Sequence, residues 1–174
     1  MHKRACYLLV LFSVISFNSL SSEKILKDYL GDYYQLGTGR LSIFFIDIYD
    51  ISLFSQTKDY LKDKPFAIVI NYLRDIKSNQ IVDSSIDEIK RISNPSKGEI
   101  ENYRSVLTSL FPNIYRGDQL IGIKKTNSDG VFFYNEKTIG KINDEELLDN
   151  FFDIWLSEKT SHPELRDKLI MRYE

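Results

Sequence analysis

The sequence predicts an α+β fold in which one antiparallel sheet is covered by a layer of helices. Strand patterns occupy two separate tracts of the chain, and a pair of helix patterns with apolar stripes follows each tract. Because strands and helices are segregated in this way, a doubly wound parallel sheet is not expected. The glycine-rich fingerprints G-x-G-x-x-G and G-x-x-x-x-G-K, which accompany nucleotide-binding folds, do not occur.

The N-terminal segment has the three-part pattern of a secretory signal peptide. Lys3 and Arg4 precede the apolar run Ala5–Phe17, and the serines that follow suit a cleavage after residue 21 or 22. A membrane anchor is the alternative, but the run is shorter than the roughly 20 residues that span a bilayer. We therefore expect a signal peptide over residues 1–22 and a single domain over residues 23–174. The protein would be exported, to the periplasm or secreted, with no integral membrane segment after cleavage.

The composition excludes several classes of function. Cys6 is the only cysteine and lies in the signal segment, so the domain has no disulfide and no thiolate metal site. His162 is the only histidine of the domain, which argues against a histidine metal site or a Ser-His-Asp triad. The chain has 23 basic and 25 acidic residues, interspersed, so no nucleic-acid partner is expected. We expect no metal and no cofactor.

The first tract of strands runs from Tyr33 to Phe54 and predicts two strands that break near Tyr49-Asp50. Gly37-Thr38-Gly39 opens the tract and indicates a turn. Leu41–Ile48 has apolar residues at both odd and even positions, which predicts a strand buried on both faces. A third strand is predicted over Phe66–Ile76, where alternation places Tyr72 and Arg74 on one face.

Two helices are predicted next. Ser85 and Ser96 each begin an S-x-x-E capping box, and the second helix stops at Pro112. An antiparallel meander of three strands follows, joined by turns, one of them over Asn127–Gly130, with Asp129-Gly130 expected to supply the positive φ. The three strands are predicted over Gln119–Thr126, Val131–Tyr134 and Thr138–Ile142.

The chain closes with two more helices. Asn143 is the predicted cap of the first, in which Leu147, Phe151 and Trp155 are spaced by four residues and predict a broad core-facing side. Ser161 is the predicted cap of the last helix, with a proline in its first turn.

Six motifs in this order carry a resemblance to a known family. They are Gly37–Arg40 before the strand that ends at Ile48-Tyr49, Phe66–Arg74, Phe111-Pro112 with Gly117-Asp118, Gly130–Tyr134, Phe151–Ser157, and Thr160 with Pro163 and Leu165-Arg166. Together they span about Leu36 to Ile170, and the chain resembles the chalcone isomerase-like family in its bacterial, exported branch. The resemblance implies an open-faced sandwich, one antiparallel sheet covered by a layer of helices, with a ligand cleft between them.

The resemblance also implies two kinds of chemistry. The family's plant enzymes stabilise an oxyanion with an arginine and with threonine and tyrosine hydroxyls. Alignment on Ile48-Tyr49 puts Phe44 at the position of that threonine, so no catalytic residue is assigned. Relatives that bind fatty acids hold the carboxylate with an arginine and a tyrosine. The candidate ligand-binding residues are Arg74, Tyr72, Arg40, Tyr103 and Thr160.

Each candidate has an ordinary structural alternative. Arg74 and Tyr72 would form an anion clamp at the edge of an apolar cleft, or Arg74 would pair with a surface aspartate at the strand end. Tyr103 lies on the core stripe of its helix, and Arg40 has the position of an exposed arginine at a strand start. Thr160 lies where the family has a late serine or threonine.

Three functions follow from these residues. The leading hypothesis is non-catalytic binding of a small amphipathic ligand, such as a fatty acid or another carboxylate, in the cleft between sheet and helices. The alternative is a cofactor-independent intramolecular lyase or isomerase of the chalcone isomerase type that acts on an unsaturated or phenolic substrate. A protein–protein interaction module is a third, and would expose a large apolar patch.

Overall fold

The computed structural model describes residues 17–170, with side chains from Ser22 onward. Six antiparallel strands form one sheet in the order β1-β2-β3-β4-β5-β6, and five helices accompany it. The strands are β1 (Tyr34–Ile43), β2 (Ile46–Ser55), β3 (Phe66–Tyr72), β4 (Gln119–Thr126), β5 (Asp129–Tyr134) and β6 (Lys137–Ile142). The helices are α1 (Phe17–Leu30), α2 (Ser78–Ser93), α3 (Lys97–Leu110), α4 (Glu145–Leu156) and α5 (Pro163–Ile170).

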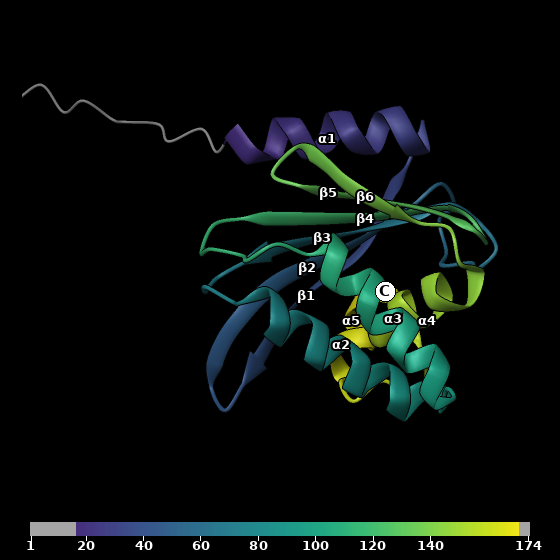
Figure 1. Cartoon of the computed structure of the whole chain (residues 1–174). Helices are drawn as coiled ribbons and strands as arrows, with labels where there is room; N and C mark the ends of the chain where they lie inside the picture. The colour runs from purple at the N-terminus through teal and green to yellow at the C-terminus, as the bar shows by residue number, and fades with distance from the viewer. Residues whose placement is uncertain (1–16, 171–174) are drawn as a thin grey trace, which may run out of the picture.

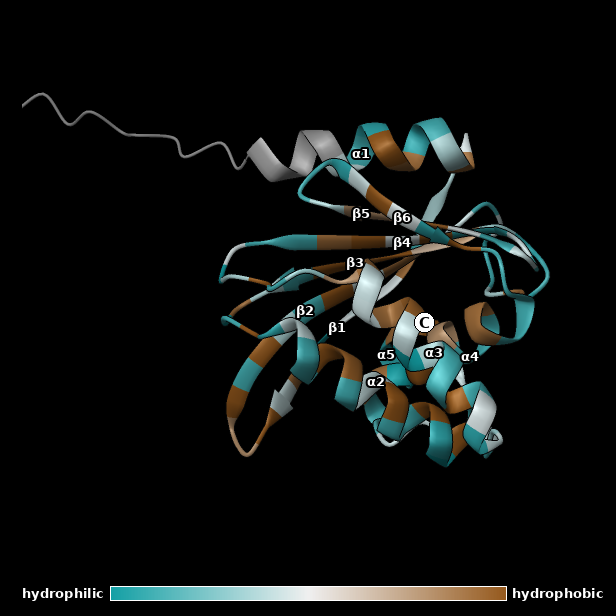
Figure 2. Cartoon of the chain, viewed as in Figure 1, coloured by the Kyte–Doolittle hydropathy of each residue, from teal (hydrophilic) through white to brown (hydrophobic). Residues whose placement is uncertain are grey.

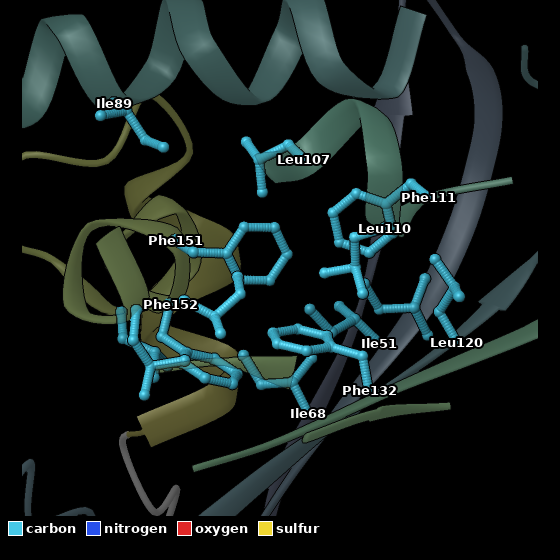
Figure 3. Close-up of a cluster of buried hydrophobic side chains, with 14 of the residues drawn as sticks. Ile51, Ile68, Ile89, Leu107, Leu110, Phe111, Leu120, Phe132, Phe151 and Phe152 are labelled. Carbon is cyan, nitrogen blue, oxygen red and sulfur yellow. The ribbon is translucent and has the colours of Figure 1, made fainter. Parts of the chain in front are cut away.

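Helices α2 to α5 cover one face of the sheet, and α1 lies across the other (Figure 1). The α+β sandwich predicted from the sequence is therefore confirmed, and all three meander strands are present. Strand β5 begins at Asp129, so the predicted Asp129-Gly130 turn lies inside the strand, and Gly130 has no positive φ. The larger core fills the space between the sheet and α2–α5. Phe132 on β5 meets Phe151 and Phe152 on α4 there (Figure 3).

Helix α1 was not predicted. Leu26 and Leu30 are buried against Val69, Ile121 and Phe133 on the sheet face opposite to the main helix layer. Its apolar residues are too sparse to give a clear helical stripe, because charged residues surround them. Most of the expected signal segment, residues 1–16, lies outside the described residues, and the remainder forms the start of α1.

The first two strands differ from the prediction in the position of the turn between them and in the start of β1. The chain turns at Phe44 and Phe45, where φ is 49° and 65°, and not near Tyr49-Asp50. Gly37 and Gly39 lie inside β1 and form no turn. A Cβ at Gly37 would stand 2.1 Å from the carbonyl oxygen of Lys168, so glycine there lets α5 approach the strand.

Helix α2 begins seven residues before the predicted capping box at Ser85. Ser85 lies inside the helix, and its hydroxyl donates to the carbonyl oxygen of Ile81 at 2.8 Å. The box at Ser96 is confirmed: the Ser96 amide donates to the Glu99 carboxylate at 2.6 Å, and the Glu99 amide to Ser96 Oγ at 3.4 Å. An S-x-x-E sequence fits a helix start and a helix interior alike, so the motif alone does not separate the two.

Three other element boundaries differ from the predicted ones by a few residues. Strand β3 ends at Tyr72 and not at Ile76, which forms an isolated bridge with Ile114. Asp144 caps α4 instead of Asn143, accepting from the Leu147 amide at 2.9 Å. Helix α5 starts at Pro163, two residues after the predicted cap.

In the described part of the chain, no helix is long and apolar enough to cross a membrane. The same residues contain no cluster of three or more histidine, cysteine, aspartate or glutamate side chains that could hold a metal ion.

Candidate ligand cavity between sheet and helices

A cavity of about 550 Å³ lies between the sheet and helices α2 and α4, with an opening to solvent. Most of its wall is apolar and comes from side chains far apart in the sequence. These side chains are Leu41, Ile43, Ile48, Ile68, Ile70, Leu120 and Phe132 from the sheet and Ile81, Phe111, Phe151, Phe152, Ile154 and Trp155 from the helical side. The volume falls within the roughly 300–1,000 Å³ of small-molecule sites.

Arg74 and Tyr72 both line this cavity, at the end of strand β3. Arg74 is exposed, so it is in contact both with the cavity and with solvent. No hydrogen bond or ion pair joins the Arg74 side chain to another residue in the described range 17–170. The alternative in which Arg74 pairs with a surface aspartate is therefore not seen in this range. The neighbouring Asp75 accepts from the Arg116 amide at 2.8 Å instead.

Tyr72 is buried, with its ring edge-on to the ring of Tyr49 at 5.7 Å between centroids. The two tyrosines are directly paired across β2 and β3. Burial raises the pKa of Tyr72, and the neighbouring Tyr49 raises it further. The Tyr72 phenol therefore stays protonated at neutral pH and is a hydrogen-bond donor, not a base.

Tyr49 and Trp155 close one side of the cavity. The indole Nε1 of Trp155 on α4 donates to the hydroxyl of Tyr49 on β2 at 2.8 Å. Burial raises the pKa of Tyr49 to about 12, although the bond from Trp155 opposes the shift. Helix α4 was predicted to face the core with Leu147, Phe151 and Trp155, which is right for Leu147 and Phe151. Trp155 is only partly buried and contributes its ring to the cavity wall.

One acidic side chain of the cavity wall, that of Glu88 on α2, is held by hydrogen bonds within the protein. Glu88 accepts from the Arg91 guanidinium at 2.6 Å and from the backbone amide of Ser161 at 2.7 Å. Burial opposes ionisation of Glu88, but the bonds from Arg91 and Ser161 outweigh it and hold its pKa below the usual range. The charge of Glu88 is thus matched by Arg91, and Arg74 is the cationic residue among those that line the cavity.

The other candidate residues lie elsewhere. Arg40 donates to Asp50 at 2.6 Å and to Asp47 at 2.8 Å, and lines a neighbouring depression beside α5 instead of the cavity itself. Tyr103 on α3 is 1% exposed and does not line the cavity. The Thr160 hydroxyl donates to the carbonyl oxygen of Ile154 at 2.7 Å, which fixes the chain after α4.

Sequence reasoning missed the part of the wall that closes the cavity. Tyr49, Ile81 and Trp155 have the residue types and spacing of core positions, and core and cavity wall share that pattern. The sequence did offer one indication of this wall. Tyr49 and Trp155 are amphipathic aromatic residues, and their polar atoms need hydrogen-bond partners when they are buried.

An antiparallel sheet covered on one face by a helical layer, with a cavity between them, defines the class of open-faced α+β sandwiches. The family model described as chalcone isomerase-like matches residues 31–170, and the chain belongs to that family. Among curated proteins, no sequence matches.

The crystal structure of a fatty-acid-binding protein from Arabidopsis thaliana is similar in fold, with a TM-score of 0.65. The match covers 79% of this chain and 86% of that one, at 14% sequence identity. At this identity the likeness concerns the fold, which agrees with the family assignment.

Proposed function

We propose that the protein is a non-catalytic binding protein, which holds a small amphipathic carboxylate such as a fatty acid in the cavity between sheet and helices. The observation that carries the proposal is Arg74, an exposed cationic residue that lines an apolar cavity of about 550 Å³ and has no ion-pair partner within residues 17–170. An acyl chain would occupy the apolar interior and its carboxylate would meet Arg74.

The energetics favour this orientation. Each buried methylene contributes about 0.8 kcal/mol, so the apolar wall provides the main driving force for a chain-like ligand. A carboxylate at the exposed opening keeps part of its hydration and gains a charge-assisted hydrogen bond from Arg74. The protonated Tyr72 phenol lies on the same cavity wall and is the second donor we assign to the headgroup.

Two observations favour binding over catalysis. Phe44, the residue that aligns with the threonine of the plant enzymes, is 90% exposed at the tip of the β1–β2 hairpin and has no hydroxyl. Oxyanion stabilisation needs an arginine and hydroxyl donors that converge on one oxygen. The similarity to a fatty-acid-binding protein supports the same choice.

We also propose that the protein is exported and belongs to the family's bacterial, exported branch. The support is the basic, apolar and small-residue pattern of residues 1–22. Cleavage after residue 21 or 22 would shorten α1 but keep Leu26 and Leu30, which are its buried contacts. Mass spectrometry of the mature protein from its native host would then find an N-terminus at residue 22 or 23, and an intact Met1 would contradict export by this route.

Native mass spectrometry of the purified protein tests the binding proposal. We expect a complex with one fatty acid, either co-purified or formed on adding sodium decanoate. Incubation with a 2′-hydroxychalcone should leave the substrate unchanged. Absence of any complex, or formation of a flavanone, would overturn the proposal.

A further inference from the structure

The tip of the β1–β2 hairpin exposes four consecutive apolar residues. Ile43 is 45% exposed, Phe44 90%, Phe45 105% and Ile46 46%. The tip is brown at the lower end of the hairpin in Figure 2. Pairing between β2 and β3 starts only at Tyr49, so the residues of the tip pair with each other and with no third strand.

The backbone of this turn does not favour the side chains that it carries. Phe44 and Phe45 both have positive φ, as the two central residues of a type I′ hairpin turn do, and such turns favour Asn-Gly. Bulky residues in the left-handed region cost free energy. Phe44 and Phe45 therefore hold a strained backbone at an exposed position, and their side chains gain no burial within residues 17–170. Such strain points to a function in which these side chains contact something outside the folded domain.

The tip is continuous with the ligand cavity. Ile43 is partly exposed at the tip and also lines the cavity, together with Leu41 and Ile48 from the same hairpin. Ile43 therefore joins the exposed apolar tip to the wall of the cavity.

A self-contained polar network lies directly behind the tip. Arg40 binds Asp50 and Asp47, and the Ser42 hydroxyl donates to Asp47 at 2.6 Å. One arginine and two aspartates leave this network with no excess positive charge. It limits how deeply the hairpin could enter an apolar medium, and it gives no attraction to anionic groups.

We propose that the hairpin tip, Ile43–Ile46, inserts into the surface of a lipid bilayer and holds the cavity mouth against it. Through this contact an acyl ligand would pass between bilayer and cavity without crossing bulk water. The choice of a lipid surface rests on the proposed function, because an acyl ligand is itself held in bilayers.

The shape of the tip favours lipid over a protein partner. Four side chains on a two-residue turn make a small convex surface, whereas stable protein interfaces bury about 800 Å² on each partner. A bilayer interface needs no matching pocket, and its affinity grows with the apolar area inserted.

The test is co-sedimentation with phosphatidylcholine vesicles of the wild type and the double variant Phe44→Asn, Phe45→Gly. This pair suits the turn, so the fold should be retained or stabilised while both aromatic rings are removed. The partition coefficient should fall on the order of 100-fold, because each inserted phenylalanine contributes about tenfold. The matched control is Leu61→Ser with Tyr34→Ser. It removes two exposed apolar side chains near the other end of the β1–β2 pair, where Tyr34 pairs with Ser55, and should leave the partition coefficient unchanged.

Replacing part of the phosphatidylcholine with phosphatidylglycerol should not strengthen binding, because the network behind the tip carries no positive excess. Equal sedimentation of wild type and tip variant overturns the proposal. So does a concentration-dependent dimer in analytical ultracentrifugation that the tip variant abolishes, since the occupant would then be a second copy.

Decanoate binding in vesicle-free solution separates this proposal from the function on which it rests. The tip variant should bind decanoate like the wild type. If neither binds decanoate but vesicle binding still depends on the tip, the proposed function fails and the lipid contact stands. If both bind decanoate and neither sediments, the lipid contact fails alone.

Discussion

The indole nitrogen of Trp155 donates a hydrogen bond of 2.8 Å to the hydroxyl of Tyr49, which joins helix α4 to strand β2 across the side of the cavity. Both residues line the cavity, so this hydrogen bond links its helical wall to its sheet wall. Trp155 is also the only tryptophan of the chain, so its fluorescence reports on the cavity directly.

Replacing Tyr49 by phenylalanine should destabilise the protein by about 1 kcal/mol, because the indole N–H loses its acceptor. Urea unfolding measures the difference. Tyr33→Phe is the matched control: Tyr33 is a partly buried aromatic on the opposite face of the sheet, packed edge-on against Phe54, and should change stability by less than about 0.5 kcal/mol. Equal effects of the two variants would show that the Trp155 bond contributes nothing.

Gly37→Ala should destabilise the protein by about 1–3 kcal/mol, since its Cβ would stand 2.1 Å from the backbone oxygen of Lys168. Backbone atoms of α5 cannot rotate away as a side chain can. Gly98→Ala is the control, because Gly98 is exposed in the first turn of α3 and its Cβ would meet nothing within 4 Å. That variant should be neutral or up to about 1 kcal/mol more stable. Thermal unfolding of both variants checks this, and a stable Gly37→Ala protein would refute the close packing of α5.

The fold could be predicted well where local patterns and tertiary packing agree. The meander strands alternate regularly and end at turn residues, and Ser96 begins a true capping box. Prediction failed where packing overrides local chemistry. Phe44 and Phe45 form a turn although neither is a residue type that favours turns. Gly37 leaves room for the backbone of α5, which lies about 130 positions away in the chain.

Of the five candidate residues, Arg74 and Tyr72 line the cavity, and their role in binding stays a prediction. Arg74 and Tyr72 were found because an arginine and a tyrosine on an apolar strand are unusual, and both line the cavity. Arg40 has the same chemistry as Arg74, but its two aspartates come close only through the hairpin pairing. That pairing depends on where the turn falls, which residue types alone did not indicate.

The pH dependence of stability should be linked to Asp118. Burial opposes its ionisation, but bonds from the Tyr134 hydroxyl, the Asn135 amide and the Tyr115 backbone outweigh burial and lower its pKa from the usual 3.8. A carboxyl with a lowered folded-state pKa stabilises the fold above its unfolded-state pKa, and this contribution is lost as pH falls through the folded-state pKa.

The stability difference between wild type and Asp118→Asn should therefore be constant above about pH 5 and should shrink below about pH 4. Urea unfolding from pH 3 to pH 7 measures it. Asp118 also ties down the end of β3, since its carbonyl oxygen accepts from the Tyr72 amide at 2.9 Å. A difference that grows toward low pH would contradict this sign.

The central claim is that Arg74 binds the headgroup of an acyl ligand inside the cavity, and a fluorescence titration of Trp155 tests it most directly. Wild type, Arg74→Met and Arg116→Met are titrated with decanoate and with 1-decanol. Arg116 is the matched control, because it is an exposed arginine near Arg74 that does not line the cavity.

We predict that Arg74→Met weakens decanoate binding by about 10- to 100-fold, which is the range for a hydrogen bond to a charged group. Decanol binding should be unchanged in all three proteins, and Arg116→Met should bind decanoate like the wild type. If Arg74→Met binds decanoate as tightly as the wild type, or if decanoate leaves the fluorescence of the wild type unchanged, the account is contradicted.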